Sequence, residues 1–174
     1  MPNQISVSLS EAVLINLRRI IQSIDLHSRD LVKRFGLTVP QLMILKEING
    51  ARDISASELA RAVSLSQATV TGILERLENR GLIARERSES DRRRIYVTVT
   101  DTGRDMLAAA PPLMQESFTR QFGMLASWEQ HMILAAVERI AVMMDAKRID
   151  AAPVLTTGPI DPSAGGPAET ETPM

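Results

Sequence analysis

Apolar residues recur at helical spacing in two short segments near the middle of the chain, and a strand-like alternation follows them. Leu59, Ala62 and Val63 lie three and four residues apart, which predicts one buried face of a first helix. A second apolar stripe runs from Val70 to Leu77. Apolar and polar residues then alternate over 95–100, which is typical of a half-buried strand.

Cap and turn residues separate these segments. Ser55 with Glu58 three residues later is a capping-box sequence, and Ser66 can cap the second helix. Gly81 is typical of a left-handed helix end, and the run 82–87 then supplies a hairpin partner for the alternating strand. We therefore expect a mainly α fold with a small β-hairpin wing, the winged helix-turn-helix arrangement.

The face of the second helix opposite its apolar stripe carries small and hydrogen-bonding residues. Such a face can approach the major groove closely, and Gln67, on its flank with Thr71, can bond to adenine through both amide atoms. Gly72 costs about 0.5–1 kcal/mol relative to alanine inside a helix, so it needs an explanation. Its outward position on the helix favours a close approach to DNA over close helix packing. The candidate DNA contacts of this helix are Ser66, Gln67, Ala68, Thr71, Gly72 and Arg76.

The loop of the predicted hairpin is rich in arginine. From Arg76 to Arg94 there are seven basic and four acidic residues, a local balance of +3. A cluster of this kind is often a solvated loop, but here it directly follows a groove-facing helix and can contact the DNA backbone or the minor groove. We expect the aspartate of the tip to pair with an arginine and fix its shape. The wing candidates are Asp91, Arg92, Arg93 and Arg94.

A long helix is predicted before this module. Residues 8–34 have apolar residues at helical spacing, and Gly36 marks the end of the helix. Thr38 opens a second helix that ends at Asn49-Gly50, with Pro40 in its first turn, where a missing N–H costs little. The apolar stripe of the long helix comprises Leu14, Leu17, Ile21, Ile24 and Leu31.

Further helices are predicted after the wing. Residues 101–122 have a helical pattern that Pro111 and Pro112 must kink or break, because prolines remove helix hydrogen bonds. Ser127 is predicted to cap the last helix. The residues expected inside are Met132, Ile133, Val137, Ile140 and Met144. The first and last helices carry apolar stripes outside the winged core, so both need a partner surface.

The composition narrows the class of protein. With 174 residues, 44% of them apolar and 3% aromatic, the chain can form one domain with an aliphatic core. No apolar run approaches the length of a membrane span, and the N-terminus has no signal-peptide pattern. The lack of cysteine excludes disulfides, thiolate metal sites and a cysteine-based peroxide sensor. We therefore expect the protein to be located in the cytoplasm of a bacterial-type cell.

The composition changes near residue 150. Residues 151–174 hold five prolines, three glycines, three acids and no basic residue, which predicts a disordered tail. The tail masks a charge asymmetry: the whole chain carries −1, whereas the first 149 residues carry +3. The predicted division is a dimerisation helix, a DNA-binding module, C-terminal dimerisation helices and the tail, covering residues 1–37, 38–100, 101–148 and 149–174.

Four motifs resemble the MarR family of bacterial transcription regulators. They are Glu58-Leu59-Ala60, Thr69-Val70-Thr71, the exit Leu77–Ile83, and the wing signature from Asp91 to Thr100. The resemblance extends from about Ser8 to Ala146. It implies a homodimeric winged helix that binds double-stranded DNA at pseudo-palindromic operators, usually as a repressor released by a small molecule. By position it assigns DNA contacts to Gln67, Ala68, Thr71, Gly72, Arg76, Arg92 and Arg93. The chain departs from the family pattern at Gly72, where many relatives have arginine, and at Val99.

The first helix carries two further expectations from the resemblance. The segments Ile20–Arg29 and Gly36–Leu42 are similar to regulators of ectoine or choline–glycine betaine genes, which implies control of osmoprotectant metabolism. Family effectors bind between the dimer helices and the winged module. His27 and Arg29 are the candidate effector contacts there, since they can meet an anion; the alternative for His27 is a helix-surface or inter-subunit hydrogen bond.

An enzyme and a protein-binding adaptor are the two alternatives to a DNA-binding function. An enzyme is disfavoured because His27 and His131 lie in separate helices without metal-spaced neighbours, and there is no nucleophile–base pattern or phosphate loop. No cofactor and no metal are predicted. A winged-helix adaptor that binds proteins is the stronger alternative, because the fold also serves that purpose. Three consecutive arginines beside a groove-facing helix favour DNA.

Overall fold

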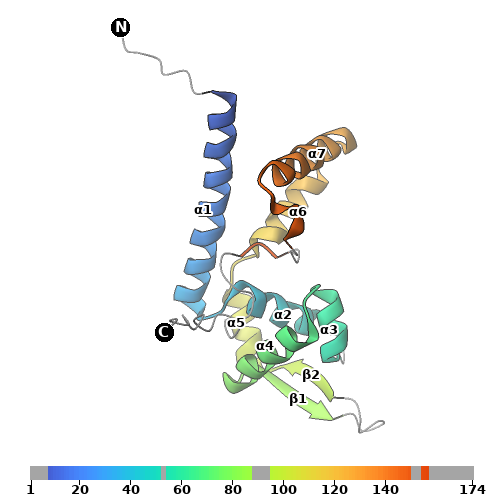
Figure 1. Ribbon diagram of the computed structural model, residues 1–174. Coiled ribbons are helices and arrows are strands. Elements are labelled where there is room, and N and C mark those ends of the chain that lie inside the picture. The colour runs from blue at the N-terminus through green and yellow to red at the C-terminus, as the bar shows by residue number, and fades with distance from the viewer. Residues whose placement is uncertain (1–7, 52–53, 88–94, 150–153, 157–174) are drawn as a thin grey trace, which may run out of the picture.

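The computed structural model describes residues 8–51, 54–87, 95–149 and 154–156. In Figure 1 a winged module forms the lower body, one long helix extends from it on one side, and two helices extend from it on the other. The elements are α1 (Leu9–Phe35), α2 (Val39–Gly50), α3 (Ala56–Ala62), α4 (Gln67–Asn79), β1 (Ile83–Arg87), β2 (Ile95–Val99), α5 (Asp101–Ala109), α6 (Met114–Gly123), α7 (Ser127–Met143) and a final 3-10 turn (Ala146–Arg148).

The predicted caps of the winged module are present. The Ser55 hydroxyl accepts from the Glu58 N–H at 3.3 Å, and the Glu58 carboxylate accepts from the Ser55 N–H at 2.9 Å, which completes the capping box of α3. The Ser66 hydroxyl accepts from the Thr69 N–H at 3.1 Å and opens α4. Gly81 follows α4 with a φ of 68°, the left-handed conformation predicted for it.

The strands β1 and β2 pair antiparallel as the predicted wing, with Ile83 opposite Val99. Val97 and Val99 are buried, which confirms the inward face of the alternating strand. The Val97 N–H also donates to the Ile54 carbonyl at 3.2 Å, so the segment before α3 adds a single bridge to the hairpin. The structure thus confirms a mainly α, winged helix-turn-helix fold.

The core is aliphatic, as the low aromatic content predicts. Leucine, isoleucine and valine from α2, α3, α4 and the hairpin fill it, and α1 contributes one buried residue, Leu31. Leu113, between α5 and α6, is buried in the same core. The fully buried side chains include Leu37, Leu42, Ile44, Leu45, Leu59, Ile73, Leu74, Leu77 and Leu82. This core holds the inner face of α4 against α2 and α3.

Local signals also set the ends of α1. Ser8 caps its N-terminus, and hydrogen bonds from the Ser8 backbone N–H and hydroxyl to the Glu11 carboxylate lower the pKa of Glu11. At the other end Gly36 adopts a φ of 63°, and its N–H donates to the Val32 carbonyl at 2.8 Å. Within the described ranges, no helix has both the length and the apolar character needed to cross a membrane.

The C-terminal helices differ from the prediction in one cap. The double proline ends α5 at Ala109 and separates it from α6, as expected. Ser127, however, is the first residue of α7, and Ala126 occupies the cap position. The Glu129 carboxylate accepts from the Ala126 N–H at 2.8 Å, so the glutamate satisfies the helix start without a cap hydroxyl. The predicted cap at Ser127 was wrong by one residue.

The apolar stripes of the outer helices are exposed in the single chain. None of the α6 or α7 residues is buried, and Leu31 is the one buried residue of α1. The predicted interior of α7 was therefore wrong for one chain, because no described element covers that face. In the outer helices and the residues next to them, the large apolar side chains that are more than half exposed are Leu9, Leu14, Ile20, Ile21, Leu26, Phe118, Met124, Trp128, Met132, Leu134, Val137, Met143 and Met144.

A short part of the predicted tail contacts the module. Residues 154–156 are half-buried, and Val154 packs against the aliphatic core. Val154 and Leu155 are apolar residues within an otherwise proline-rich and polar segment, and the disordered tail stays a prediction.

Candidate nucleic-acid interface

The helix α4 presents two distinct faces. Val70, Ile73, Leu74 and Leu77 are at most 2% exposed and fix the inner face in the core. On the outer side, at the N-terminal end, Ser66, Gln67 and Ala68 are exposed. Thr71 and Gly72 follow on the same side, partly exposed. The structure therefore brings the sequence-predicted helix residues together on one outward surface.

Hydrogen bonds decide which polar atoms on this surface can meet a ligand. The Thr71 hydroxyl donates to the Gln67 carbonyl at 2.8 Å, so its proton stays within the helix, whereas its oxygen lone pairs and methyl group remain usable. The Ser66 hydroxyl is engaged with Thr69. Within the described part of the chain the Gln67 side-chain amide makes no hydrogen bond, so both its donor and its acceptor are open to a base edge.

Gly72 lies next to an arginine and not against another helix. A Cβ at Gly72 would first meet the Arg76 guanidinium, at 3.7 Å, and no other described residue comes within 4 Å. Close helix packing therefore does not explain this glycine. The Arg76 side chain lies one turn further along, partly buried. Because Gly72 has no side chain, the outward face of α4 does not protrude beside that guanidinium, and another surface can approach the helix closely.

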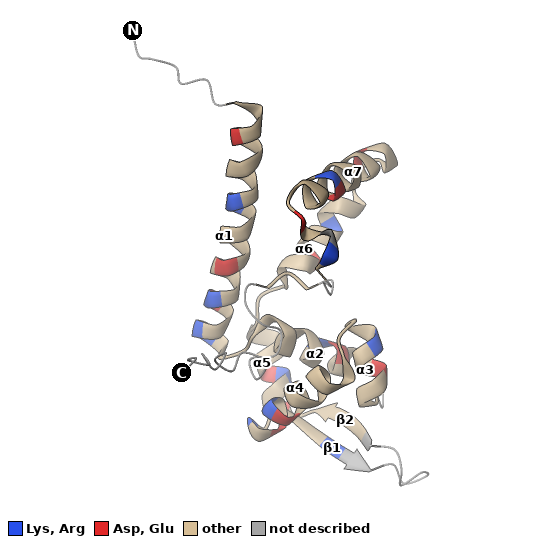
Figure 2. Ribbon diagram, in the orientation of Figure 1, with Lys and Arg blue, Asp and Glu red and all other residues tan. Residues whose placement is uncertain are grey.

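Two features that orient α4 have no strong sequence signal. Ser64, in the turn before α4, has a φ of 53°, a conformation that residues other than glycine rarely adopt. The Leu65 N–H then donates to the Ala60 carbonyl at 3.0 Å, which closes the turn. At the other end of α4, Glu78 pairs with Arg85 of β1 at 3.1 Å. Acidic and basic residues lie side by side where α4 meets the wing (Figure 2).

The predicted tip of the wing lies outside the described residues. Asp91, Arg92, Arg93 and Arg94 fall within 88–94, so their positions relative to α4 are not described. The base of the wing is described, and β1 and β2 lead away from α4 toward this segment (Figure 1). The sequence prediction for these four residues stays a prediction.

The two candidate effector residues do not converge. Arg29 pairs with Asp25 at 2.9 Å within α1, and its side chain is 77% exposed. His27 is partly buried, and its Nε2 atom is buried without a hydrogen-bond partner among the described residues. Residues two apart on a helix face different directions, so one ligand at His27 would not reach Arg29 on the same face.

A cleft of about 600 Å³ lies between α1, α6 and α7, and sequence analysis did not find it. Ser23 of α1, one turn before His27, lines it together with Phe118, Phe122 and Ile133. Phe118 and Phe122 stack with their ring centroids 5.3 Å apart. The spacing of these phenylalanines on a helix was the available signal, but the cleft itself depends on residues about a hundred positions apart.

Comparison with known proteins identifies the family to which this winged module belongs. The MarR family model matches residues 37–95, the second helix through the wing. The transcriptional regulator HosA of Escherichia coli O127:H6 (strain E2348/69) is 34% identical over 104 residues, which is 60% of this chain and 77% of HosA. The chain belongs to the MarR family. The HTH-type regulator MgrA of Staphylococcus aureus is 32% identical over 75 residues, 43% of the chain and 51% of MgrA.

Solved structures share the fold of this MarR-family protein. Staphylococcus aureus MepR in complex with DNA matches with a TM-score of 0.55 and 20% identity, covering 74% of this chain and 96% of MepR. Bordetella bronchiseptica BpsR, whose DNA binding is regulated by 6-hydroxynicotinic acid, matches with a TM-score of 0.53 and 28% identity, covering 77% and 96%. Members of the MarR family are DNA-binding transcription regulators and not enzymes, so this protein is a DNA-binding regulator.

Proposed function

We propose that this MarR-family regulator binds a pseudo-palindromic DNA site as a homodimer. The N-terminal part of α4 enters the major groove at each half-site, and the wing arginines contact the backbone or the adjacent minor groove. The observation that carries this proposal is the outer surface of α4. Its open Gln67 amide is exposed at the start of the helix, on the flank of the face that carries Ala68 and Gly72, while Val70, Ile73, Leu74 and Leu77 bury the other face in the core.

The roles follow from the chemistry of each side chain. The Gln67 amide can donate to and accept from one adenine edge, which no other base offers in the same pattern. Ser66, Ala68 and Gly72 keep the surface low, and Thr71 can accept from or pack on the DNA with its remaining lone pairs and methyl group. Arg76, Arg92, Arg93 and Arg94 supply positive charge for phosphates, while Asp91 shapes the wing.

Selection from a pool of random duplexes tests this function without knowledge of the target genes. We expect enrichment of an inverted repeat with half-site centres about one helical turn apart and an adenine at a fixed position in each half. A pool that shows no enrichment after several rounds would contradict specific DNA recognition. It would favour the alternative function, a winged-helix adaptor that binds proteins.

The homodimer is supported by the outer helices. α1, α6 and α7 expose long apolar side chains that no described element of the chain covers. Leu14 and Met132, for example, are 58% and 57% exposed. A second copy offers the same apolar surfaces, as a two-fold interface requires, and burying them removes apolar area from water. A dimer also has two α4 helices, one for each half-site of the repeat.

An aspartate in place of Leu14 is expected to weaken the dimer. Each dimer would bury two carboxylates in place of two leucines, and losing about 1.5–3 kcal/mol per buried leucine raises the dissociation constant at least tenfold. Sedimentation velocity at several concentrations measures the change. Asn16→Asp adds the same charge at an exposed polar position of α1 and should leave the dimer intact. A wild-type protein that sediments as a monomer at all concentrations would contradict the homodimer.

We also propose that a small anionic effector binds near His27 and releases the DNA. Three observations support this site: the His27 Nε2 atom without a hydrogen-bond partner among the described residues, the cleft lined by Ser23 one turn before His27, and the regulation of BpsR by 6-hydroxynicotinic acid. Arg29 does not share the face of His27 and pairs with Asp25, so we assign the effector contact to His27 alone. We further propose that the DNA-bound protein represses transcription and that the effector relieves this repression.

Alanine at His27 is expected to raise the concentration of 6-hydroxynicotinic acid that half-releases the DNA by about tenfold, the worth of one hydrogen bond to a charged group. Fluorescence anisotropy of a labelled operator measures the release. Arg29→Ala removes a charge two residues away and should respond like the wild type. An unchanged response of His27→Ala, or a wild type that the acid does not release, would overturn this assignment.

Control of osmoprotectant genes rests on the resemblance of Ile20–Arg29 and Gly36–Leu42 alone. Transcript levels of ectoine and glycine betaine genes, compared between a deletion strain and its parent under osmotic stress, test it. Equal levels in both strains would contradict this branch. We also propose a cytoplasmic location, because a regulator of chromosomal genes acts there.

A further inference from the structure

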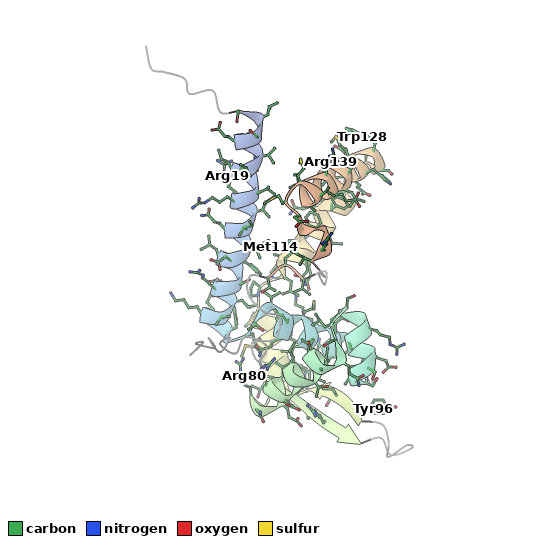
Figure 3. The ribbon with its side chains drawn as sticks, in the orientation of Figure 1. Arg19, Arg80, Tyr96, Met114, Trp128 and Arg139 are labelled. Atoms are coloured by element: carbon green, nitrogen blue, oxygen red, sulfur yellow. The ribbon has the colours of Figure 1, made fainter. Side chains whose placement is uncertain are left out.

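Arg80 joins the end of α4 to the end of α1. It occupies the C-cap position of α4, and its guanidinium donates to the Gly36 carbonyl at 2.5 Å and to the Phe35 carbonyl at 3.0 Å. These acceptors lie 44 and 45 residues away in sequence, at the last turn of α1. Figure 3 shows Arg80 on the winged module, near the lower end of α1.

The end of α1 is built to receive this side chain. The last carbonyls of a helix have no partner within it, and the helix dipole favours a cation there. Gly36 turns the chain with a φ of 63°, which leaves its own carbonyl and that of Phe35 accessible to Arg80. A Cβ at Gly36 would lie 3.2 Å from the Arg80 Nη2 atom, so the glycine also gives the guanidinium room.

Few other contacts fix α1 relative to the module. Leu31 is its one buried residue, and the N-terminal two-thirds of the helix is exposed or half-exposed. The ion pairs of Arg29 and Arg34 stay within α1 itself. The two hydrogen bonds of Arg80 therefore form a clasp, defined here as Arg80 with the Phe35 and Gly36 carbonyls, that ties α4 directly to α1.

We infer that Arg80 is a positioning residue for DNA recognition, because the clasp fixes the direction of α4 relative to the dimerisation helix. This inference rests on the proposed function. In a homodimer α1 belongs to the body that both subunits share, whereas α4 reads one half-site. Two copies of the clasp then set the separation of the two α4 helices, which must match half-sites about 34–36 Å apart or a multiple of this. Arg80 acts through α4, with two of its five donors on protein carbonyls.

The test compares Arg80→Gln, Arg80→Lys and a control, Arg34→Gln. Arg34 lies at the same end of α1, pairs with Asp30 and lies over the Phe35 ring, 5.2 Å from its centroid. Its substitution removes the same charge without removing a hydrogen bond between α1 and α4. Each variant is titrated against the selected operator, a single half-site, and operators with one base pair added or removed at the centre. Salt dependence, thermal stability and dimerisation are measured for each.

We expect Arg80→Gln to keep its half-site affinity within about twofold and to lose about tenfold of its preference for the native spacing, a loss typical of coupling between sites. Arg80→Lys, which can still donate to a carbonyl, should recover part of that preference even if Arg80→Gln folds poorly. Arg34→Gln should match the wild type.

Two results would overturn the inference. One is an unchanged spacing preference in both Arg80 variants. The other is an equal loss of affinity on all duplexes with a salt slope lower by about 1 per half-site, which would make Arg80 a phosphate contact. A wild type that gains nothing from a second half-site would instead contradict the proposed homodimeric function, so the two failures are distinguishable.

Discussion

Alanine at Gly103 is expected to lower the free energy of unfolding by about 3 kcal/mol or more, the upper range of overpacking costs. Gly103 lies in the first turn of α5, and a Cβ there would overlap the Leu82 carbonyl oxygen and lie 2.7 Å from the Val99 Cγ1 atom. The Leu82 oxygen is a main-chain atom that already accepts from the Thr100 N–H at 3.1 Å, so it cannot swing aside. The helix must shift away from the hairpin, and the junction between α5 and the wing opens.

Thermal unfolding measures this effect. For a chain of this length each kcal/mol shifts Tm by about 2–4 °C, so we expect Tm to fall by about 6–12 °C or more. Gly50→Ala is the control, because no described residue lies within 4 Å of a Cβ there, and alanine should leave Tm unchanged or slightly higher. A Gly103→Ala protein that melts with the wild type would show that α5 does not pack on Leu82 as described.

The second large effect is expected on DNA affinity, where the wing and α4 should fail in different ways. Arg92→Ala or Arg93→Ala should weaken binding to every duplex and flatten its salt dependence. The slope of log K against log salt should become shallower by about 2 per dimer, since each wing loses one phosphate contact. Arg19→Ala is the control, because Arg19 lies far along α1 from the winged module (Figure 3). Unchanged affinity and slope in both wing variants would remove these arginines from the interface.

Gln67→Ala should change sequence preference and leave the salt slope intact. Loss of one bidentate base contact costs about 1–3 kcal/mol of discrimination per half-site. Titration of the variant against operators with each base in turn at the selected adenine measures this change. The wild type should prefer adenine, and Gln67→Ala should bind the four operators with similar affinity. Retained preference for adenine in the variant would mean that another side chain reads that base.

Much of the winged module could be predicted because its signals are local. Ser55, Ser66 and Gly81 act on backbone atoms within four residues, so the sequence alone predicts where α3 and α4 begin and where α4 ends. The outward positions of Ala68 and Gly72 follow from the 3.6-residue period once the apolar stripe is recognised, and Gln67 is exposed because it is the first residue of α4. These features need no knowledge of the rest of the fold.

The features that sequence analysis missed depend on distant partners. The clasp of Arg80 joins residues 44 apart, and no local pattern distinguishes this arginine from others near it. The sequence gives no sign that Gly103 differs from other residues at a helix start, but in the fold a Cβ there would overlap the Leu82 carbonyl oxygen. The residues of α7 expected inside follow a correct apolar pattern, but a pattern cannot say whether the covering surface belongs to the same chain.

The most direct measurement of specific DNA recognition is a titration of the full-length protein against two labelled duplexes. One is the operator obtained by selection, and the other is a scrambled duplex of equal length and composition. Both are measured at two salt concentrations. We predict binding to the operator that is about 10³-fold or more tighter than to the scrambled duplex at the higher salt, with both affinities falling as salt rises. Equal affinity for the two duplexes at both salt concentrations would contradict the assignment of α4 and the wing as a sequence-reading surface.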